Sequence, residues 1–237
     1  MKKEKNNHTV LLVLFLTMWM GAAAQDFRSD YAKMQERYAT MAKFSCEVQV
    51  SMYENEKDAK PEQVLLSAVK KMDGNYWYMF GKTKMIVNEK CILYLDEESK
   101  EMTYTIRDKK NEAVPPVQNA AAMIDTLLKK NDSVVFAGIE GMLKHYIVYS
   151  SKGLILKTDL FLNKETYTLT KLIYHYDKKK YASEKVEINY LKIDLAPVFA
   201  PDEFSEKKYA VYSNGRLKPQ GIYAAYQTNI IDQNDFK

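Results

Sequence analysis

The sequence predicts an α+β protein that is mainly β and built on antiparallel strands. Helical periodicity is confined to two segments, residues 26–42 and 117–130. Apolar and polar residues alternate with a period of two through most of the remaining chain, as in half-buried strands. Short charged or glycine-containing turns such as Asp73-Gly74 separate these runs, and connections of that length join antiparallel neighbours.

Each predicted helix has one apolar side. The first stripe recurs in steps of four and three residues and consists of Phe27, Tyr31, Met34, Tyr38 and Met41. Either Asp26 or Ser29 can cap this helix at its start. The second helix follows two prolines, and its apolar side consists of Ala121, Ile124, Leu127 and Leu128.

Two sets of strands are predicted, one before and one after the second helix. The first set covers residues 44–52, 64–72, 75–80, 85–87, 91–95 and 102–106. The second set covers residues 134–136, 142–149, 154–162, 169–176 and 186–190. Pro197 and Pro201 exclude a central strand after this set. We expect the residues from Ser213 onward to form a polar tail.

The first 24 residues have the pattern of a cleavable secretory signal peptide. Lys2, Lys3 and Lys5 precede an apolar run at 10–20, which is shorter than a typical membrane span. Small residues follow, so we expect cleavage between Ala24 and Gln25, or one residue later. No cysteine stands at the expected cleavage site directly after the apolar run, which disfavours lipidation. The alternative is an uncleaved N-terminal anchor.

The remaining chain is predicted to form one domain. We expect a signal peptide at 1–24, the folded domain at 25–212 and the polar tail at 213–237. No second apolar run is long enough for a membrane-spanning helix. The net charge is +4 for the whole chain and, without the three Lys and one Glu of residues 1–24, +2 for the rest, which gives no basic footprint for nucleic acid.

The order of these elements resembles the periplasmic lipoprotein carriers of the LolA-like and LolB-like fold. The resemblance covers residues 26–205 and lies in a helix leading to FSCEVQVSMYEN, in NYWYMFGKTKMIVNEKCILYLDEESKEMTYT, in GLILKTDLFLNKETYTLTKLIYHYDKK and in VEINYLKIDLAPVFAPDEF. It implies an incomplete, half-open antiparallel β-barrel of about ten to eleven strands with an N-terminal helix and a helical lid. Such a hollow accommodates acyl chains. The carriers hold the lid with an arginine on an early strand, and the strand at 44–53 has none.

The predicted lining of the hollow is apolar. The chain has 18 Tyr and 12 Met, which give an adaptable surface for acyl chains, although each of them can equally be an ordinary strand or core residue. The candidate lining residues are Val48, Val50, Tyr78, Leu95, Ile124, Leu127 and Leu128.

The sequence contains no recognisable catalytic or metal-binding motif. His145 and His175 lie singly in strands, which favours sheet-face histidines over zinc ligands. Cys46 lies in an apolar alternation, and we favour two unpaired core cysteines, Cys46 and Cys91, over a disulfide. Nucleophile elbows, phosphate loops and calcium loops are absent from the sequence. We therefore expect no enzymatic activity and no cofactor, with a hydrolase as a distant alternative.

The function predicted from the sequence is that of an exported, non-enzymatic binding protein with an apolar cavity for acyl chains of lipids or lipoproteins. The expected location is the periplasm, with peripheral contact to the outer membrane as a further option. The alternative is a periplasmic accessory protein of an envelope or secretion assembly. In that case the interior is filled, and envelope proteins bind an exposed edge strand or the tail.

Overall fold

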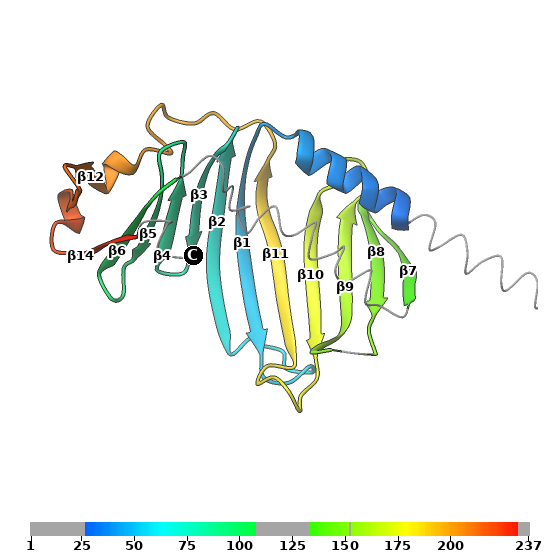
Figure 1. Cartoon of the computed structure of the whole chain (residues 1–237). Helices are drawn as coiled ribbons and strands as arrows, with labels where there is room; N and C mark the ends of the chain where they lie inside the picture. Colours follow the sequence, from blue (N-terminus) through cyan, green and yellow to red (C-terminus); the bar gives the residue numbers. More distant parts are fainter. Residues whose placement is uncertain (1–26, 108–132, 152, 232–237) are drawn as a thin grey trace, which may run out of the picture. The chain divides into compact units, whose positions relative to one another are not determined.

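A computed structural model describes residues 27–107, 133–151 and 153–231 of the chain (Figure 1). Residues 27–40 form a helix. The first strands are β1 (Lys43–Tyr53), β2 (Gln63–Met72), β3 (Asn75–Phe80), β4 (Thr83–Val87), β5 (Cys91–Asp96) and β6 (Glu101–Ile106). The next are β7 (Ser133–Glu140), β8 (Leu143–Tyr149), β9 (Ile155–Asn163), β10 (Leu169–Tyr176) and β11 (Lys185–Asp194). Then come η1 (Glu206–Lys208), β12 (Ala210–Ser213), β13 (Arg216–Pro219), η2 (Gly221–Tyr223) and β14 (Gln227–Ile231).

The strands form one large open sheet and one small hairpin sheet. The order in the twelve-stranded sheet is β14-β6-β5-β4-β3-β2-β1-β11-β10-β9-β8-β7, and β12 pairs with β13. Neighbours such as β3 and β4 are antiparallel, whereas β14 runs parallel to β6. The predicted class, a mainly β α+β protein with an open antiparallel sheet and an N-terminal helix, is confirmed.

The chain divides into two compact units. Of the described residues, unit 1 comprises 27–40, 52–62, 133–151 and 153–188, and unit 2 comprises 41–51, 63–107 and 189–231. In the described part of the chain, no helix is long and apolar enough to cross a membrane.

In unit 1 the helix of residues 27–40 packs on β8 through its predicted stripe. Phe27 is buried and meets Tyr146 edge to face, with ring centroids 4.9 Å apart. The buried carboxylate of Asp30 accepts hydrogen bonds from Tyr146 Oη and from Lys144 Nζ, both at 2.6 Å. The backbone N–H of Leu169 donates to Tyr38 Oη at 3.2 Å. An apolar stripe and one charged anchor therefore fix the helix to the sheet.

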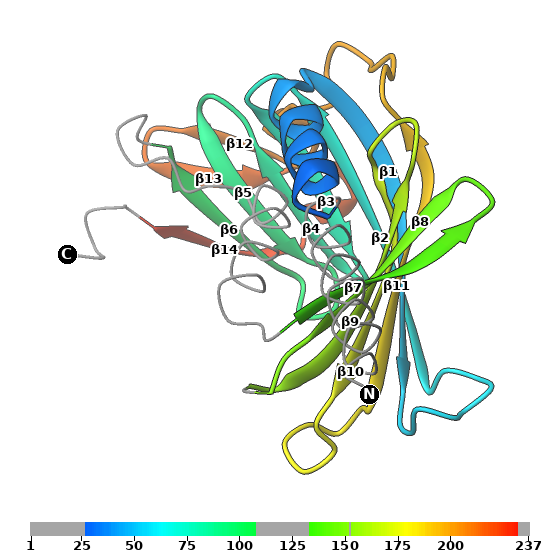
Figure 2. The ribbon, with the colours of Figure 1, turned by 90° about the vertical axis from the view of Figure 1, so that its right-hand side faces the viewer.

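In unit 2 the residues after β11 continue the folded structure beyond the predicted domain boundary. The β12–β13 hairpin and β14 lie beside β5 and β6 (Figure 2). Leu217 and Tyr223 are buried among the side chains of β5 and β6, in the segment where a polar tail was expected. The strand β14 also raises the number in the large sheet to twelve, above the ten to eleven expected. The prediction that Pro197 and Pro201 exclude a central strand is confirmed, because no strand is assigned in the fully described stretch between Asp194 and Ala210.

Candidate functional site

The strands β2 to β5 of unit 2 present two faces with different chemistry. Tyr78 pairs across the strands with Val69 and with Met85, so these three side chains share one face. Leu95 pairs with Lys84, which belongs to the opposite face. We call the first side the tyrosine face; it carries Ser67, Val69, Lys71, Tyr76, Tyr78, Met85, Val87, Ile92 and Tyr94. We call the second side the core face; it carries Lys70, Trp77, Lys84, Ile86, Leu93, Leu95, Met102 and Tyr104.

The core face is closely packed. Ile86, Leu93 and Leu95 are fully buried, and the residues that cover them are Tyr209, Ala210, Leu217 and Tyr223. Tyr104 also stacks on Tyr212 of β12, with ring centroids 4.8 Å apart. The C-terminal segment therefore completes a solid core on this side of the sheet.

Polar groups on the core face have partners. The Lys70 ammonium pairs with Glu203 at 2.5 Å and lies 4.8 Å from the Trp77 ring centroid. Lys84 pairs with Glu97. Trp77 Nε1 donates to Tyr209 Oη at 3.0 Å. Such pairing removes most of the cost of placing charged and polar groups in a packed region.

Nearby, Asn88 connects the turn after β4 to the C-terminal segment. Its buried amide donates to Glu206 Oε2 at 2.7 Å and to the Phe204 carbonyl at 3.1 Å. Its side-chain carbonyl accepts from the backbone N–H groups of Lys90 and Cys91. The attachment of the C-terminal segment is therefore polar as well as apolar.

The tyrosine face is largely apolar and unevenly covered, and Tyr76 and Val87 on it are buried. Tyr76 and Tyr78 stack almost parallel, with centroids 5.8 Å apart and an interplanar angle of 3°. Val69, Met85 and Ile92 are half-buried. On this face an apolar ligand would find aromatic surface and a flexible thioether next to each other, a lining suited to chains of variable shape.

Two polar groups on the tyrosine face lack partners. Ser67 Oγ and Tyr78 Oη are buried and make no hydrogen bond with any described residue. Burial, with a smaller contribution from Tyr76, raises the pKa of Tyr78 above its usual range. Burial also lowers the pKa of Lys71, and the nearby carboxylate of Asp73 opposes this shift. Unpaired buried polar groups are rare in folded proteins and suggest that a bound molecule supplies the partners.

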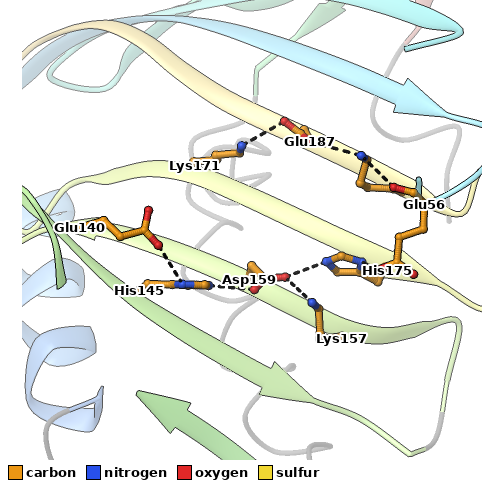
Figure 3. A network of polar contacts seen from close by, with 9 residues as sticks. Glu56, Glu140, His145, Lys157, Asp159, Lys171, His175 and Glu187 are labelled. Carbon is orange, nitrogen blue, oxygen red and sulfur yellow. Dashed lines mark hydrogen bonds and ion pairs between the residues drawn. The ribbon is translucent and has the colours of Figure 1, made fainter. Parts of the chain in front are cut away.

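Unit 1 carries a charged network on the face of β8 to β10 that bears His145 and His175 (Figure 3). Asp159 accepts hydrogen bonds from His145 Nε2 at 2.8 Å, His175 Nε2 at 2.7 Å and Lys157 Nζ at 3.0 Å. We call this face the charged face. Its outer contacts are His145–Glu140 at 3.5 Å, His175–Glu56 at 3.0 Å and the ion pair Lys171–Glu187 at 3.1 Å.

The His175–Glu56 contact lacks hydrogen-bond alignment, since His175 Nδ1 has no hydrogen-bond partner among the described residues. The His145 ring also stacks on Phe161, with centroids 4.2 Å apart. Within the described ranges, no group of histidine, cysteine and acidic side chains has an arrangement that could hold a metal ion. Both imidazole Nε2 atoms are instead occupied by the same carboxylate.

The environment of Asp159 holds its pKa well below the usual range. Burial alone would raise that pKa, but the hydrogen bonds from His175, Lys157 and His145 outweigh burial. Asp159 is therefore ionised at all but strongly acidic pH, and the network is a fixed charge cluster there.

Both cysteines are buried free thiols. Burial, with a smaller contribution from Glu47, raises the pKa of Cys46 to about 12. Burial likewise raises the pKa of Cys91 to about 11. Both are therefore protonated at neutral pH, the form that is a poor nucleophile.

The structure places four of the seven candidate lining residues. Tyr78 lies on the tyrosine face, whereas Leu95 lies on the core face and is fully buried. Val48 and Val50 are half-buried on one side of β1. Ile124, Leu127 and Leu128 lie outside the described residues, as do the helix predicted at 117–130, the signal peptide and the expected cleavage site at Ala24 and Gln25.

The sequence interpretation missed Asp159, Ser67 and Lys71. Asp159 was detectable as a lone acid inside an apolar strand, but its histidine partners come from neighbouring strands whose pairing the sequence does not reveal. Ser67, Val69 and Lys71 are spaced two residues apart, so they lie on the same face of β2. Their lack of partners only becomes apparent in three dimensions.

Comparisons with known proteins give structural neighbours only. A scan against models of protein families finds no match, and a search of curated proteins finds none either. An uncharacterized conserved protein from Thermus thermophilus is similar with a TM-score of 0.48 and 9% identity, over 88% of this chain and 99% of that chain.

Two further neighbours come from other bacteria. A putative outer membrane lipoprotein-sorting protein domain from Vibrio parahaemolyticus has a TM-score of 0.33 and 12% identity, over 75% of this chain and 97% of its own. A LolA superfamily protein from Nitrosomonas europaea has a TM-score of 0.34 and 10% identity, over 76% of this chain and 98% of its own. The neighbours thus include members of the family that the sequence resembles.

Proposed function

We propose that the protein is an exported, non-enzymatic binding protein that takes up acyl chains of lipids or lipoproteins on the tyrosine face. The observation that carries the proposal is the contrast within one set of strands. The core face is covered by the C-terminal segment, whereas Val69, Met85 and Ile92 on the tyrosine face remain half-buried. Four strands at this spacing span about 14 Å, and each buried methylene contributes about 0.8 kcal/mol to binding.

Titration with an environment-sensitive fatty-acid probe tests the proposal. The purified mature protein is expected to bind the probe saturably. Val69→Asp places a charge on the tyrosine face and is expected to weaken binding at least tenfold. Val211→Asp is the matched control, because Val211 is an exposed valine of β12 in the same unit. A wild-type protein that ignores the probe would contradict the proposal.

Export is the second part of the proposal and is supported by the pattern of residues 1–24. Mass spectrometry of the protein from a periplasmic fraction is expected to show Gln25 as the first residue. A chain that retains Met1 and stays with the membrane fraction would support the uncleaved anchor instead.

A second candidate, an accessory protein acting through protein contacts, is favoured by two side chains of unit 2. Val198 is 98% exposed and Ile222 is 86% exposed, although both are large and apolar. A double variant, Val198→Ser with Ile222→Ser, is expected to lose envelope partners in a pull-down while keeping probe binding if this candidate holds. Truncation near Val211 is unsuitable, because it removes Leu217 and Tyr223 from the core.

A further inference from the structure

Lys71 lies on the tyrosine face, next to the stacked tyrosine pair. It pairs across the strands with Tyr76, and Val69, two residues earlier, pairs with Tyr78. The side chain is half-buried, and among the described residues it makes no hydrogen bond and no ion pair within 4.0 Å. Its neighbour Lys70 points to the opposite face and is fully paired. A desolvated ammonium beside apolar surface attracts an anion.

The two unpaired hydroxyls lie farther along the same face. Ser67 pairs with Phe80, and Tyr78 pairs with Val69, so the Tyr78 position lies between those of Ser67 and Lys71 along β2. Successive positions on one face are about 7 Å apart, and Ser67 is therefore about 13 Å from Lys71. Buried O–H groups without acceptors destabilise a protein, and a ligand carbonyl would relieve that cost.

We infer that the tyrosine face recognises an anionic acyl-ester lipid, with Lys71 on a phosphodiester headgroup and Ser67 and Tyr78 donating to the ester carbonyl. This inference rests on the proposed function and adds the chemistry of the headgroup. A free fatty acid has a single polar end, so it can serve either Lys71 or the hydroxyls. An ester phospholipid carries both an anion and nearby carbonyl acceptors. Their order matches the order along the face, where Lys71 comes first and the hydroxyls of Tyr78 and Ser67 follow.

Three single-chain ligands of equal length separate the contributions. Lysophosphatidylglycerol carries the anion and the ester, lysophosphatidylcholine carries the ester without net charge, and the fatty acid carries the anion without the ester. The mature protein is expected to bind the first about tenfold more tightly than the second, which corresponds to about 1.4 kcal/mol for a charge-assisted contact. Affinities are measured by calorimetry below the critical micelle concentrations.

Four variants assign the contacts. Lys71→Gln is expected to bring lysophosphatidylglycerol down to the affinity of lysophosphatidylcholine and to leave the latter unchanged. Tyr78→Phe is expected to weaken both lysophospholipids several-fold but not the fatty acid. Lys70→Gln and Tyr94→Phe are the matched controls, one on the opposite face and one an exposed tyrosine of the same face. Neither is expected to change the selectivity.

The outcomes distinguish this inference from the proposed function. Equal binding of all three ligands, with no effect of Lys71→Gln, would overturn the headgroup assignment and leave acyl binding intact. A fatty acid that binds as tightly as lysophosphatidylglycerol would overturn the ester assignment. Failure of every ligand to bind the wild-type protein would overturn both the inference and the proposed function.

Discussion

Two neighbouring lysines show how the two faces of unit 2 differ. Lys70 on the core face has a carboxylate at 2.5 Å and an indole beneath it. Lys71 on the tyrosine face is half-buried and makes no ion pair within 4.0 Å among the described residues, and the nearby carboxylate of Asp73 acts on it only over a longer distance. The tyrosine hydroxyls of the two faces differ in the same way. Tyr209 Oη accepts a hydrogen bond from Trp77, whereas Tyr78 Oη makes none in the part of the chain that the structure describes. Complete polar pairing accompanies structural packing, and incomplete pairing marks the surface where we place the ligand.

The charged face of unit 1 extends the comparison. It contains buried Asp159 and two mostly buried histidines, which together could suggest a catalytic or metal site. Asp159 nevertheless contacts both histidines and Lys157 at 3.0 Å or less, all from strands β8 to β10, and His175 Nδ1 is the one fully buried polar atom of this group that makes no hydrogen bond among the described residues. We therefore assign the network to stability, and the predictions below separate such paired groups from the groups of the tyrosine face.

The largest effect is expected from the core face. Leu95→Ala should lower the free energy of unfolding by about 4 kcal/mol, because it leaves a cavity in a closely packed core. The fatty-acid probe should still bind the folded variant with wild-type affinity. Met85→Ala, on the tyrosine face, should lower the free energy of unfolding less than Leu95→Ala does, and it should weaken binding of the probe. Urea denaturation and probe titration check both, with the exposed Leu191→Ala as control. If Leu95→Ala weakened binding of the probe and Met85→Ala did not, the assignment of the two faces would be reversed.

The next effect concerns the charged face. Asp159→Asn should lower the free energy of unfolding by about 3 kcal/mol, because it removes the counter-charge of Lys157 and one of the acceptor oxygens that Lys157 and the two histidines share. Acyl-probe affinity should not change. The control is Asp202→Asn, which removes an exposed ion pair with Lys208 and should cost less than about 1 kcal/mol. An Asp159→Asn variant as stable as the wild type would show that the network is not structural.

The pH dependence follows from the low pKa of Asp159. Since that pKa is lower in the folded than in the unfolded chain, the unfolded chain binds the extra proton as the pH falls. The stabilisation is therefore fully present above about pH 4 and is progressively lost below it, toward the lower pKa of the folded state. Urea midpoints between about pH 5 and about pH 2.5 should fall more steeply for the wild type than for Asp159→Asn. Parallel profiles would contradict this assignment.

The smallest difference in stability is expected when the same substitution, Tyr→Phe, is made at Tyr146 and at Tyr78. Tyr146→Phe removes a hydroxyl that donates to buried Asp30 at 2.6 Å and should cost about 2 kcal/mol. Tyr78→Phe removes a buried hydroxyl that has no partner among the described residues, so the free energy of unfolding should stay the same or rise slightly. Thermal and urea unfolding measure both. Equal losses at the two sites would mean that the Tyr78 hydroxyl is paired in solution.

The sequence predicted the elements whose pattern is long and regular. The stripe Phe27, Tyr31 and Met34 and the alternation of β1 follow directly from burial on one side. The strands β12 and β13 are only four residues long and carry single buried residues among exposed ones, so no period is visible in them. Their core role depends on contacts with distant residues of β5 and β6.

The candidate site was predicted only in part, for a related reason. Tyr78 and Leu95 look alike in the sequence, because both are apolar members of strands with alternating patterns. Which face each one joins depends on the register between strands, and a shift of one residue would exchange the faces. Which face is then covered depends on where the C-terminal segment packs.

Photolabelling tests the central claim most directly. A fatty acid with a terminal diazirine is bound to the mature protein and irradiated, and tandem mass spectrometry then assigns the labelled residues. We predict labels on the tyrosine face, at Val69, Tyr78, Met85 or Ile92, and none at Leu93 or Leu95 in the same peptides. Labels confined to other parts of the chain, or no saturable labelling at all, would contradict the assignment of this face as the acyl-binding surface.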